Sequence, residues 1–353
     1  MGYCIARFRG TIPGMRGLVC FLAACAAMVA PLSAARNTLD FYFVDVEGGQ
    51  ATLIVTPAGE SLLVDAGWPG FEGRDPMRIQ EAMKQAGIQH IDYFWMTHYH
   101  TDHVGGLEAL AEKVTIKNFV DHGDNNETNA GGQRLSASYE RARAKGKRIT
   151  LKVGEKLPLK GVEVLTVAAN GELLMNPVKG GGAENAACAA SQKKALDTTE
   201  NARSLGFLLT FGKFRFLDLG DLTWNKELDL VCPKNLLGKV DVYLTTHHGM
   251  DMSGPAQIVH ALAPRVAIMN NGARKGGSAP AVEVVRSSPG LEDLWQVHFA
   301  AAGGADHNAP ADQIANLEEK CQGHGLKVSA RKDGGFEVVN LRNQHKKTYS
   351  ARR

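Results

Sequence analysis

The spacing of apolar and polar residues along the chain changes several times between strand-like alternation and helical periodicity. Three apolar runs of β-type residues come first, separated by the turn-forming stretches EGGQ and PAGE: LDFYFVDV, ATLIVT and SLLVDAG. Helical spacing follows at roughly 75–86, then the strand YFWMTH, and a further helix is expected from Val104. The pattern therefore predicts a meander of strands that leads into strand–helix alternation.

The same alternation continues through the rest of the chain. The hairpin LGFLLTFGKFRFLDLGD and helices near 255–262 and 311–321 are expected. Further strands are expected in TIKNFVDHG, ITLKV, GVEVLTVAA, VDVYLTTHHG, RVAIMNN, LWQVHFA and GFEVVN. Such an order predicts an α/β (α+β) protein with two sheets and outer helices.

Two segments depart from this pattern. Residues 171–200 are rich in Gly, Ala and Asn and have no period, so we expect a flexible insertion with little apolar surface to bury. If it lies beside the active site, such a loop is expected to close over substrate and set selectivity. The end of the chain, 341–353, is expected to be a mobile basic tail.

The N-terminus has the composition of an export signal. Arg7, Arg9 and Arg16 precede an apolar run that ends in small residues, so we expect residues 1–35 to be removed near Ala35. The alternative is lipidation at Cys25, within a stretch that resembles a lipobox. Either form of processing predicts a periplasmic or extracellular protein without a membrane span after removal of the signal.

Charge and cysteine content narrow the choice of partner. Removing the signal takes three arginines from the 40 basic residues and leaves them equal in number to the 37 acidic ones, so there is no strong nucleic-acid signature. Cys188, Cys232 and Cys321 remain, which allows at most one internal disulfide, and inert thiols are the favoured interpretation.

The stretch WMTHYHTDHVGG holds the strongest chemical motif. His98, His100, Asp102 and His103 fall at the end of an expected strand, where the turning backbone lets their side chains converge. Imidazole nitrogen together with carboxylate oxygen suits zinc, with manganese or iron as possible substitutes. The motif predicts that His98 and His100 bind one ion while Asp102 and His103 face a second.

Other strand ends offer more ligands. FLDLGDLT places Asp221 after a strand, where its carboxylate could bridge both ions. DVYLTTHHG delivers His247 and His248 in the same way. Alone these are modest signals, but beside HxHxDH they support one another.

On these stretches, the chain resembles the metallo-β-lactamase superfamily. Within it, the chain is most similar to the soluble hydrolase domain of competence DNA-uptake proteins of the ComEC type and to phosphorylcholine esterases. The resemblance covers about 39–271 and implies an αββα sandwich with a binuclear site at one edge, within a hydrolase domain that we place at 36–340. It implies that the metal ligands are His98, His100, Asp102, His103 and Asp221. Asp65 would be a buried supporting residue.

Two departures from the family pattern leave ligands open. Many members have a histidine in GHTxGS before the bridging aspartate, whereas this chain has ENARS, so Asn201 or Glu200 takes that place and His122 competes with them. The last histidine ligand of related hydrolases has no counterpart in GGSAP. His248 is preferred for that role, and His307 is the alternative.

Such a site predicts hydrolysis. Two ions would hold a bridging water, lower its pKa towards about 7 and polarise the substrate. We expect Asp102 and His247 to be catalytic, with His247 or His248 giving a proton to the leaving group. The predicted function is that of a secreted zinc-dependent hydrolase acting on phosphodiester or other small-molecule substrates. The alternatives are hydrolysis of a lactone or β-lactam on the same ions and a non-catalytic secreted binding protein.

Overall fold

The structure, a computed structural model, describes Gly10 and residues 37–352. The expected export signal and its alternative at Cys25 lie outside the described residues. Residues 37–352 fall within one compact unit, Ala35–Arg353. No helix in this described part is both long and apolar enough to cross a membrane.

The first sheet contains nine strands in the order β20-β19-β18-β1-β2-β3-β4-β5-β6. They are β1 Leu39–Phe43, β2 Thr52–Val55, β3 Ser61–Val64, β4 Ile91–Trp95, β5 Ile116–Asp121, β6 Lys147–Thr150, β18 Leu326–Ala330, β19 Phe336–Asn340 and β20 Lys346–Tyr349. Strands β3 to β6 run parallel, while the pairs from β20 to β3 are antiparallel. The N-terminal and C-terminal parts of the chain therefore share one sheet through the pairing of β1 with β18.

The second sheet has the order β17-β16-β15-β14-β12-β11-β8-β7, with β9 paired to β8. Its strands are β7 Lys156–Leu157, β8 Glu163–Ala169, β9 Glu172–Leu173, β11 Gly206–Phe211, β12 Phe214–Asp218, β14 Val242–Leu244, β15 Val266–Met269, β16 Asp293–His298 and β17 Ile314–Asn316. A small separate ladder joins β10 Ala183–Glu184 to β13 Lys234–Asn235.

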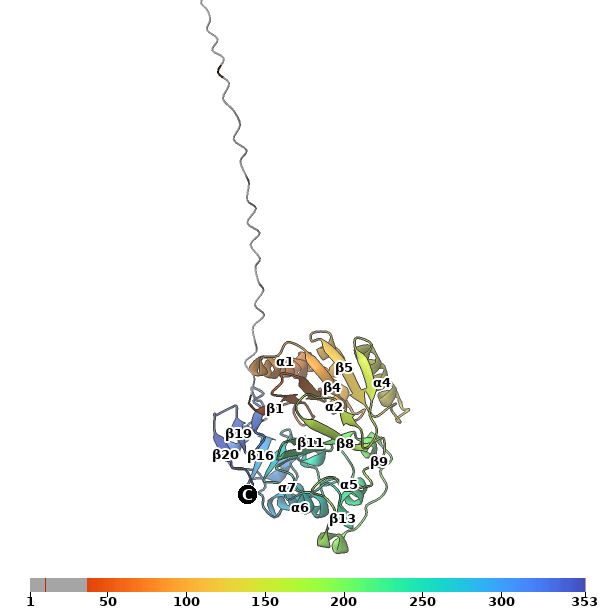
Figure 1. Ribbon diagram of the computed structural model, residues 1–353, viewed down its shortest axis with the longest axis vertical. Coiled ribbons are helices and arrows are strands. Elements are labelled where there is room, and N and C mark those ends of the chain that lie inside the picture. The colour runs from red at the N-terminus through yellow and green to blue at the C-terminus, as the bar shows by residue number, and fades with distance from the viewer. Residues whose placement is uncertain (1–9, 11–36, 353) are drawn as a thin grey trace, which may run out of the picture. The chain divides into compact units, whose positions relative to one another are not determined.

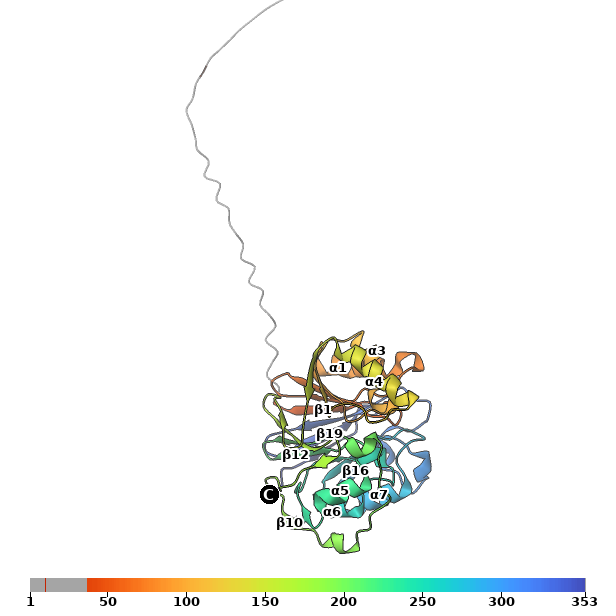
Figure 2. The ribbon, with the colours of Figure 1, turned by 90° about the vertical axis from the view of Figure 1, so that its right-hand side faces the viewer.

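Helices cover the outer face of each sheet, which gives the four layers visible in Figures 1 and 2. The α-helices are α1 Arg74–Ala86, α2 Thr101–Val104, α3 Leu107–Ala111, α4 Ala130–Arg143, α5 Trp224–Val231, α6 Ala256–Leu262 and α7 Ala279–Arg286. Short 3-10 helices occur at Phe71–Gly73, Ala186–Ala190, Glu200–Arg203, Thr246–Gly249, Ala301–Gly303 and Ala311–Gln313. The expected αββα sandwich is observed.

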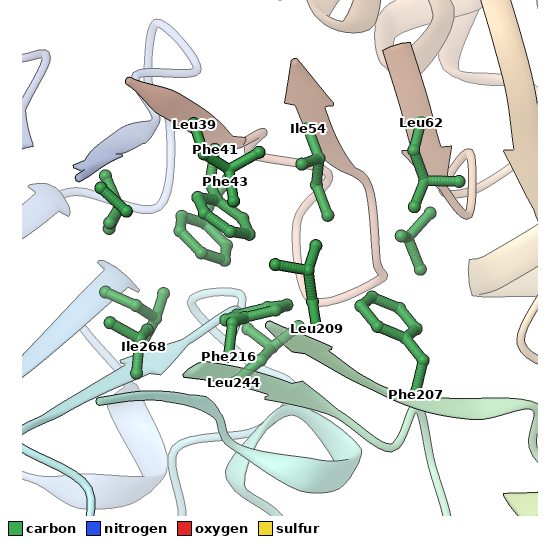
Figure 3. Close-up of a cluster of buried hydrophobic side chains, with 14 of the residues drawn as sticks. Leu39, Phe41, Phe43, Ile54, Leu62, Phe207, Leu209, Phe216, Leu244 and Ile268 are labelled. Atoms are coloured by element: carbon green, nitrogen blue, oxygen red, sulfur yellow. The ribbon is translucent and has the colours of Figure 1, made fainter. Parts of the chain in front are cut away.

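The alternation of apolar residues explains the layers. Leu39, Phe41 and Phe43 of β1 point between the sheets, where Phe41 packs 4.8 Å from Phe216 of β12 between ring centroids (Figure 3). Tyr42, between them in sequence, points instead to the layer beneath α1 and α3. Period-two side chains on both sheets thus produce one central core and two outer ones.

Two expectations about the C-terminal part of the chain are wrong. The expected helix at 311–321 is a single 3-10 turn followed by strand β17, because the buried residues 314–316 pair with β16. The expected mobile tail contains strand β20. Tyr349 is buried there, stacks on Phe336 with centroids 4.6 Å apart, and donates to Asp293 at 2.6 Å. Burial of this ring and pairing with β19 order the strand.

The insertion also differs from its expected form. Cys188 and Cys232 form a disulfide, so the interpretation of these two as inert thiols is wrong, while Cys321 stays free among the described cysteines. Asn185 donates to the carbonyls of Val231 and Gln257 at 3.1 and 3.0 Å. Polar contacts and a covalent bond attach this part of the segment to α5 and α6, while Leu173, Leu174 and Val178 pack against the outer core.

The disulfide should contribute measurably to stability. It joins residues 44 positions apart, and closing a loop of that size restricts the unfolded chain by an amount worth about 4 kcal/mol at most, with 2–4 kcal/mol typical. We expect the double variant Cys188→Ser/Cys232→Ser to lose roughly 2–4 kcal/mol of unfolding free energy in urea titrations. Reductant should destabilise the native chain by the same amount and leave the double variant unchanged. A loss below roughly 1 kcal/mol would contradict the assigned role.

Candidate metal centre

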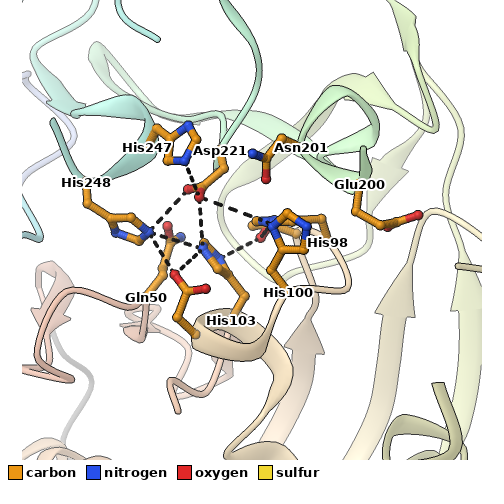
Figure 4. A network of polar contacts seen from close by, with 12 residues as sticks. Gln50, His98, His100, His103, Glu200, Asn201, Asp221, His247 and His248 are labelled. Atoms are coloured by element: carbon orange, nitrogen blue, oxygen red, sulfur yellow. Dashed lines mark hydrogen bonds and ion pairs between the residues drawn. The ribbon is translucent and has the colours of Figure 1, made fainter. Parts of the chain in front are cut away.

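The histidines and aspartates singled out above meet at one edge of the sandwich (Figure 4). The segment from His98 to His103 follows β4 of the first sheet. Asp221 follows β12 of the second sheet, and the 3-10 helix Thr246–Gly249 follows β14. The backbone N–H of Leu205 donates to Thr97 O at 2.7 Å and ties the two sheets together at this edge.

Left-handed backbone conformations direct the two histidine side chains of the HHG segment into the site. His247 and His248 have φ values of 56° and 55°, a region that non-glycine residues enter at a cost of about 1–3 kcal/mol each. The turn is held because His247 N donates to Gly220 O at 3.0 Å. A Cβ at Gly249 would approach Met269 to 2.6 Å, so the tight passage also requires glycine there.

A first group of four donor atoms comes from Asp102, His103, Asp221 and His248, all of which are buried. The Nε2 atoms of His103 and His248 lie 3.2 Å apart, and Asp102 Oδ2 lies 3.2 Å from each. Asp221 oxygens lie 3.3 Å from His103 Nε2 and 3.4 Å from His248 Nε2. Bonds of about 2.0–2.1 Å to zinc separate tetrahedral ligand atoms by about 3.3–3.4 Å, so this group fits one tetrahedral ion.

A second group lies on the other side of Asp221. His98 Nε2 is 3.0 Å from His100 Nδ1 and 4.0 Å from Asp221 Oδ2. Asn201 faces the same space, and its buried Oδ1 has no hydrogen-bond partner among the described residues. Two imidazoles, an amide oxygen and the shared carboxylate can hold a second ion, with Asp221 as the bridge.

Hydrogen bonds behind the rings decide which nitrogen faces the site. Asp65 Oδ2 accepts from His103 Nδ1 at 2.7 Å and from the Thr97 hydroxyl at 2.6 Å. Because that hydroxyl hydrogen is already used, the Thr97 oxygen accepts from His98 Nδ1 at 3.0 Å. The Nε2 atoms of His98 and His103 are thereby left as lone-pair donors for a metal.

Glu127 performs the same task for His100. Its Oε1 lies 3.1 Å from His100 Nε2, so that nitrogen is the donor and Nδ1 faces His98. Two lone pairs 3.0 Å apart repel one another unless a cation lies between them. The arrangement therefore fits a metal ion better than a protein hydrogen bond.

The charges of the first group also favour a cation. Burial would raise the pKa of Asp221, but His248 and His103 lower it well below its ordinary value. Burial would raise the pKa of Asp102 too, and His103 lowers it well below its ordinary value. Burial would lower the pKa of His103, yet Asp221 and Asp102 raise it well above its ordinary value. The ionised carboxylates thus demand positive charge at the point where a metal would lie.

His247 occupies a different position from His248. Its Nε2 lies 3.2 Å from Asp221 Oδ2, and its Nδ1 lies 3.2 Å from Ser253 Oγ. Since Ser253 donates its own hydrogen to Leu222 O at 2.7 Å, Nδ1 of His247 must be the donor. Burial lowers the pKa of His247 to about 4, so at neutral pH its Nε2 is an unprotonated acceptor at the rim of the site.

Three other candidate metal ligands do not join either group of donor atoms. His122 is buried against Tyr99 and pairs with Glu200 at 3.0 Å. Glu200 points away from the donors (Figure 4) and accepts from Asn126 N at 2.8 Å. His307 lies on a later loop, where it is part-exposed and bonds to Glu283 at 2.8 Å. Of the alternatives left open by the sequence, the geometry favours Asn201 and His248.

Several residues at the site were missed by sequence reasoning. Gln50 donates to Asp218 Oδ2 at 2.7 Å and, through its backbone N–H, to Asp102 O at 3.0 Å, so it connects the two halves. Glu127 lies in a loop with no periodic signal, whereas Lys275, in contact with Asp102, follows a strand end in the glycine-rich stretch NNGARKGGS. A polar residue at such a strand end was the signal that could have identified Lys275.

A family model described as the metallo-beta-lactamase superfamily matches residues 44–177, which include the HxHxDH motif. This segment is therefore similar to the metallo-β-lactamase superfamily, and the fold prediction is confirmed. The superfamily consists mostly of metal-dependent hydrolases, in agreement with the enzyme class expected here. Among curated proteins, no match to the chain was found.

The similarities to solved structures have low TM-scores and low sequence identities. The metallo-β-lactamase fold protein YhfI from Bacillus subtilis has a TM-score of 0.47 and 10% identity, covering 74% of this chain and 96% of that one. A diphosphatase of the PhnP family has a TM-score of 0.40 and 13% identity, covering 82% and 98%. The diiron β-hydroxylase CmlA from Streptomyces venezuelae has a TM-score of 0.36 and 18% identity, covering 65% and 44%. None of them supports an argument about the substrate or the metal of this chain.

The different roles that the geometry gives the two adjacent histidines can be tested by substitution. Because His248 completes the tetrahedral group, His248→Ala should lower the metal content from about two ions per chain towards one. His247→Ala should keep both ions and lose roughly 10²–10⁴ in turnover. Elemental analysis with turnover assays checks this, with His260→Ala on α6 as a control that changes neither. Metal loss in His247→Ala alone would exchange the two roles.

Proposed function

We propose that the chain is an exported binuclear metal-dependent hydrolase that acts on phosphodiester substrates. One observation carries the proposal: two groups of metal-ligating atoms lie on either side of Asp221, which can serve both. Paired ions about 3.5–4 Å apart recur in enzymes that displace groups at phosphorus. Zinc is the proposed metal because the first group offers two imidazole nitrogens and two carboxylate oxygens in a tetrahedral arrangement.

The ions would polarise the phosphoryl oxygens and lower the pKa of a water molecule towards the neutral range. The chain's own residues then have defined tasks. Asp65, Thr97 and Glu127 hold the histidine rings in the required tautomers. His247 Nε2, unprotonated at neutral pH, accepts a proton from the attacking water and returns it to the leaving oxygen.

This role of His247 modifies the sequence-based expectation of a direct proton donor. With a pKa lowered to about 4 by burial, the ring holds no proton on Nε2 at pH 7 until one is taken up from the reaction. Acceptance must therefore precede donation. The hydrogen bond from Nδ1 to Ser253 keeps the accepting nitrogen directed at Asp221 and the reacting atoms.

The preference for phosphodiesters rests on sequence. HHG and the asparagine of ENARS resemble ComEC-type hydrolase domains and phosphorylcholine esterases, whereas many other members of the superfamily have a histidine at the place of Asn201. A lactone or β-lactam could be hydrolysed by the same ions and is the alternative tested below. A non-catalytic binding protein is disfavoured by the full set of converging donors.

Export is proposed on two grounds. The N-terminal pattern of basic, apolar and small residues is typical of a cleaved signal. The disulfide between Cys188 and Cys232 is of the kind that persists in oxidising compartments such as the periplasm. Mass spectrometry of the protein from the periplasmic fraction would support this if the mature chain begins near Arg36.

The activity is testable on purified, zinc-reconstituted protein. We expect about two zinc ions per chain and hydrolysis of bis-p-nitrophenyl phosphate in preference to a lactone and a chromogenic cephalosporin. Asp221→Ala should remove at least one ion and lower kcat/KM at least about 10³-fold, because both groups share this carboxylate. Asp229→Ala, an exposed aspartate on α5 paired with Lys193, is the matched control. Protein that binds no zinc would refute the hydrolase, and turnover of only the lactone or cephalosporin would select the alternative.

A further inference from the structure

Lys275 is a cationic residue at the metal centre that the proposed reaction does not yet use. It lies on the loop between β15 and α7, and its ammonium group is in direct contact with Asp102 Oδ2. Its side chain remains 29% exposed, more than the adjoining Asp102 at 10%. The amine also lies 5.2 Å from the centre of the Trp68 ring. A solvent-reaching cation therefore stands beside the first group of metal donors.

Close backbone packing fixes the loop that carries Lys275. Gly272 N donates to Lys275 O at 2.8 Å, which closes a tight turn. A Cβ at Gly48 would lie 2.9 Å from Lys275 Cβ, and a Cβ at Gly272 would lie 2.5 Å from the carbonyl carbon of Glu47. Glycines on both sides let the two loops touch, so the position of Lys275 is set by backbone rather than by its contact with Asp102.

Neighbouring cations are already committed to carboxylates of the protein. Arg74 binds Asp75 at 2.6 Å, and Arg78 binds Asp45 at 2.8 Å. Arg274, directly before Lys275, turns away from the site and binds Glu319 at 2.7 Å. Lys275 differs because its partner is a carboxylate that also belongs to the metal donor set.

That shared partner has a consequence for charge. When Asp102 gives its negative charge to a metal ion, the attraction that holds the ammonium group weakens and the ion itself repels it. The backbone keeps the lysine nearby, so the ammonium group needs another anion in the same place. The position it can reach is the solvent side of the donor group, where a substrate would bind.

We propose that Lys275 determines substrate specificity by binding an anionic oxygen of the substrate next to the metal pair. This inference rests on the proposed function and narrows it: the preferred substrate carries a negative charge on or beside the group that is cleaved. A phosphodiester supplies that charge at phosphorus itself. A carboxylate next to a scissile carbonyl would present the same anionic oxygen, and a neutral lactone would not.

The test replaces Lys275 by methionine, which keeps the apolar stem and removes the charge. A charge-assisted hydrogen bond is typically worth a factor of about 10–100 in affinity. For Lys275→Met we therefore expect KM for bis-p-nitrophenyl phosphate to rise about 10–100-fold, with kcat changed less. Turnover of a neutral lactone should fall much less than turnover of the diester. Arg274→Met, the adjacent cation that binds Glu319, should behave as the native protein on both substrates.

A binding measurement tests the same point without turnover. Calorimetric titration of the zinc-loaded protein with inorganic phosphate should show about 10–100-fold weaker binding for Lys275→Met, while zinc content stays unchanged. Lys275→Arg should restore most of the affinity, since it returns the charge. A rise in KM for an acidic β-lactam as well as the diester would show that a carboxylate oxygen is bound too, in agreement with the proposal.

Other outcomes would overturn the proposal about Lys275 without contradicting the proposed hydrolase function. If the native protein is active but Lys275→Met binds phosphate equally well, Lys275 does not bind substrate. If the variant loses zinc and both activities together, Lys275 positions Asp102 and sets no specificity. Failure of the proposed function would instead appear in the native protein, as an absence of zinc binding or of hydrolysis.

Discussion

The arrangement of the site depends on a buried carboxylate beneath it. Asp65 has a positive φ of 58° and no exposed surface, and it accepts hydrogen bonds from Thr97 and His103. Those bonds direct Nε2 of His103, and through Thr97 Nε2 of His98, into the site. Without a cation, such converging lone pairs and carboxylates would repel one another. The fold holds them together because Asp65, Thr97 and Glu127 fix the rings of His103, His98 and His100 from behind.

The second constraint is that the site belongs to neither sheet alone. The HxHxDH segment follows a strand of the first sheet, whereas Asp221 and the two adjacent histidines follow strands of the second. Gln50 and the bond between Leu205 and Thr97 cross between the two halves. The central core therefore also positions the candidate site, since it separates the sheet that carries the donors of one half from the sheet that carries those of the other.

Much of this could be predicted from sequence. The period-two runs gave the inner strands correctly, and the dense HxHxDH motif located the site, because short-range spacing determines both. Helix α4 was missed: its first turn is AGGQ and its apolar face is weak, and it is supported by the Asn129 N-cap and by packing on α3. The strand at 326–330 was also missed. Its alternation is short, and its pairing with β1, almost three hundred residues earlier, leaves no local trace.

Long-range contacts account for the other errors. The sequence could not show that Cys188 lies beside Cys232, or that Tyr349 inserts between Trp295 and Phe336. Likewise, neither Glu127 nor Lys275 belongs to a motif, and their roles depend on which side chains lie opposite them. Asn201 and His248 were left among alternatives for the same reason. Local pattern names the candidates, and tertiary geometry selects among them.

The pairing of β1 with β18 has a consequence for how the chain is made. Strand β1 lies at the start of the described chain, yet its partner spans Leu326–Ala330 and the sheet ends with β20 at Tyr349. During synthesis the first sheet cannot close, and the central core stays open on one side, until almost the whole polypeptide has left the ribosome. Sheets with such distant pairings close slowly. Throughout that interval one edge of β1 has no partner strand, since β2 pairs only with its other edge.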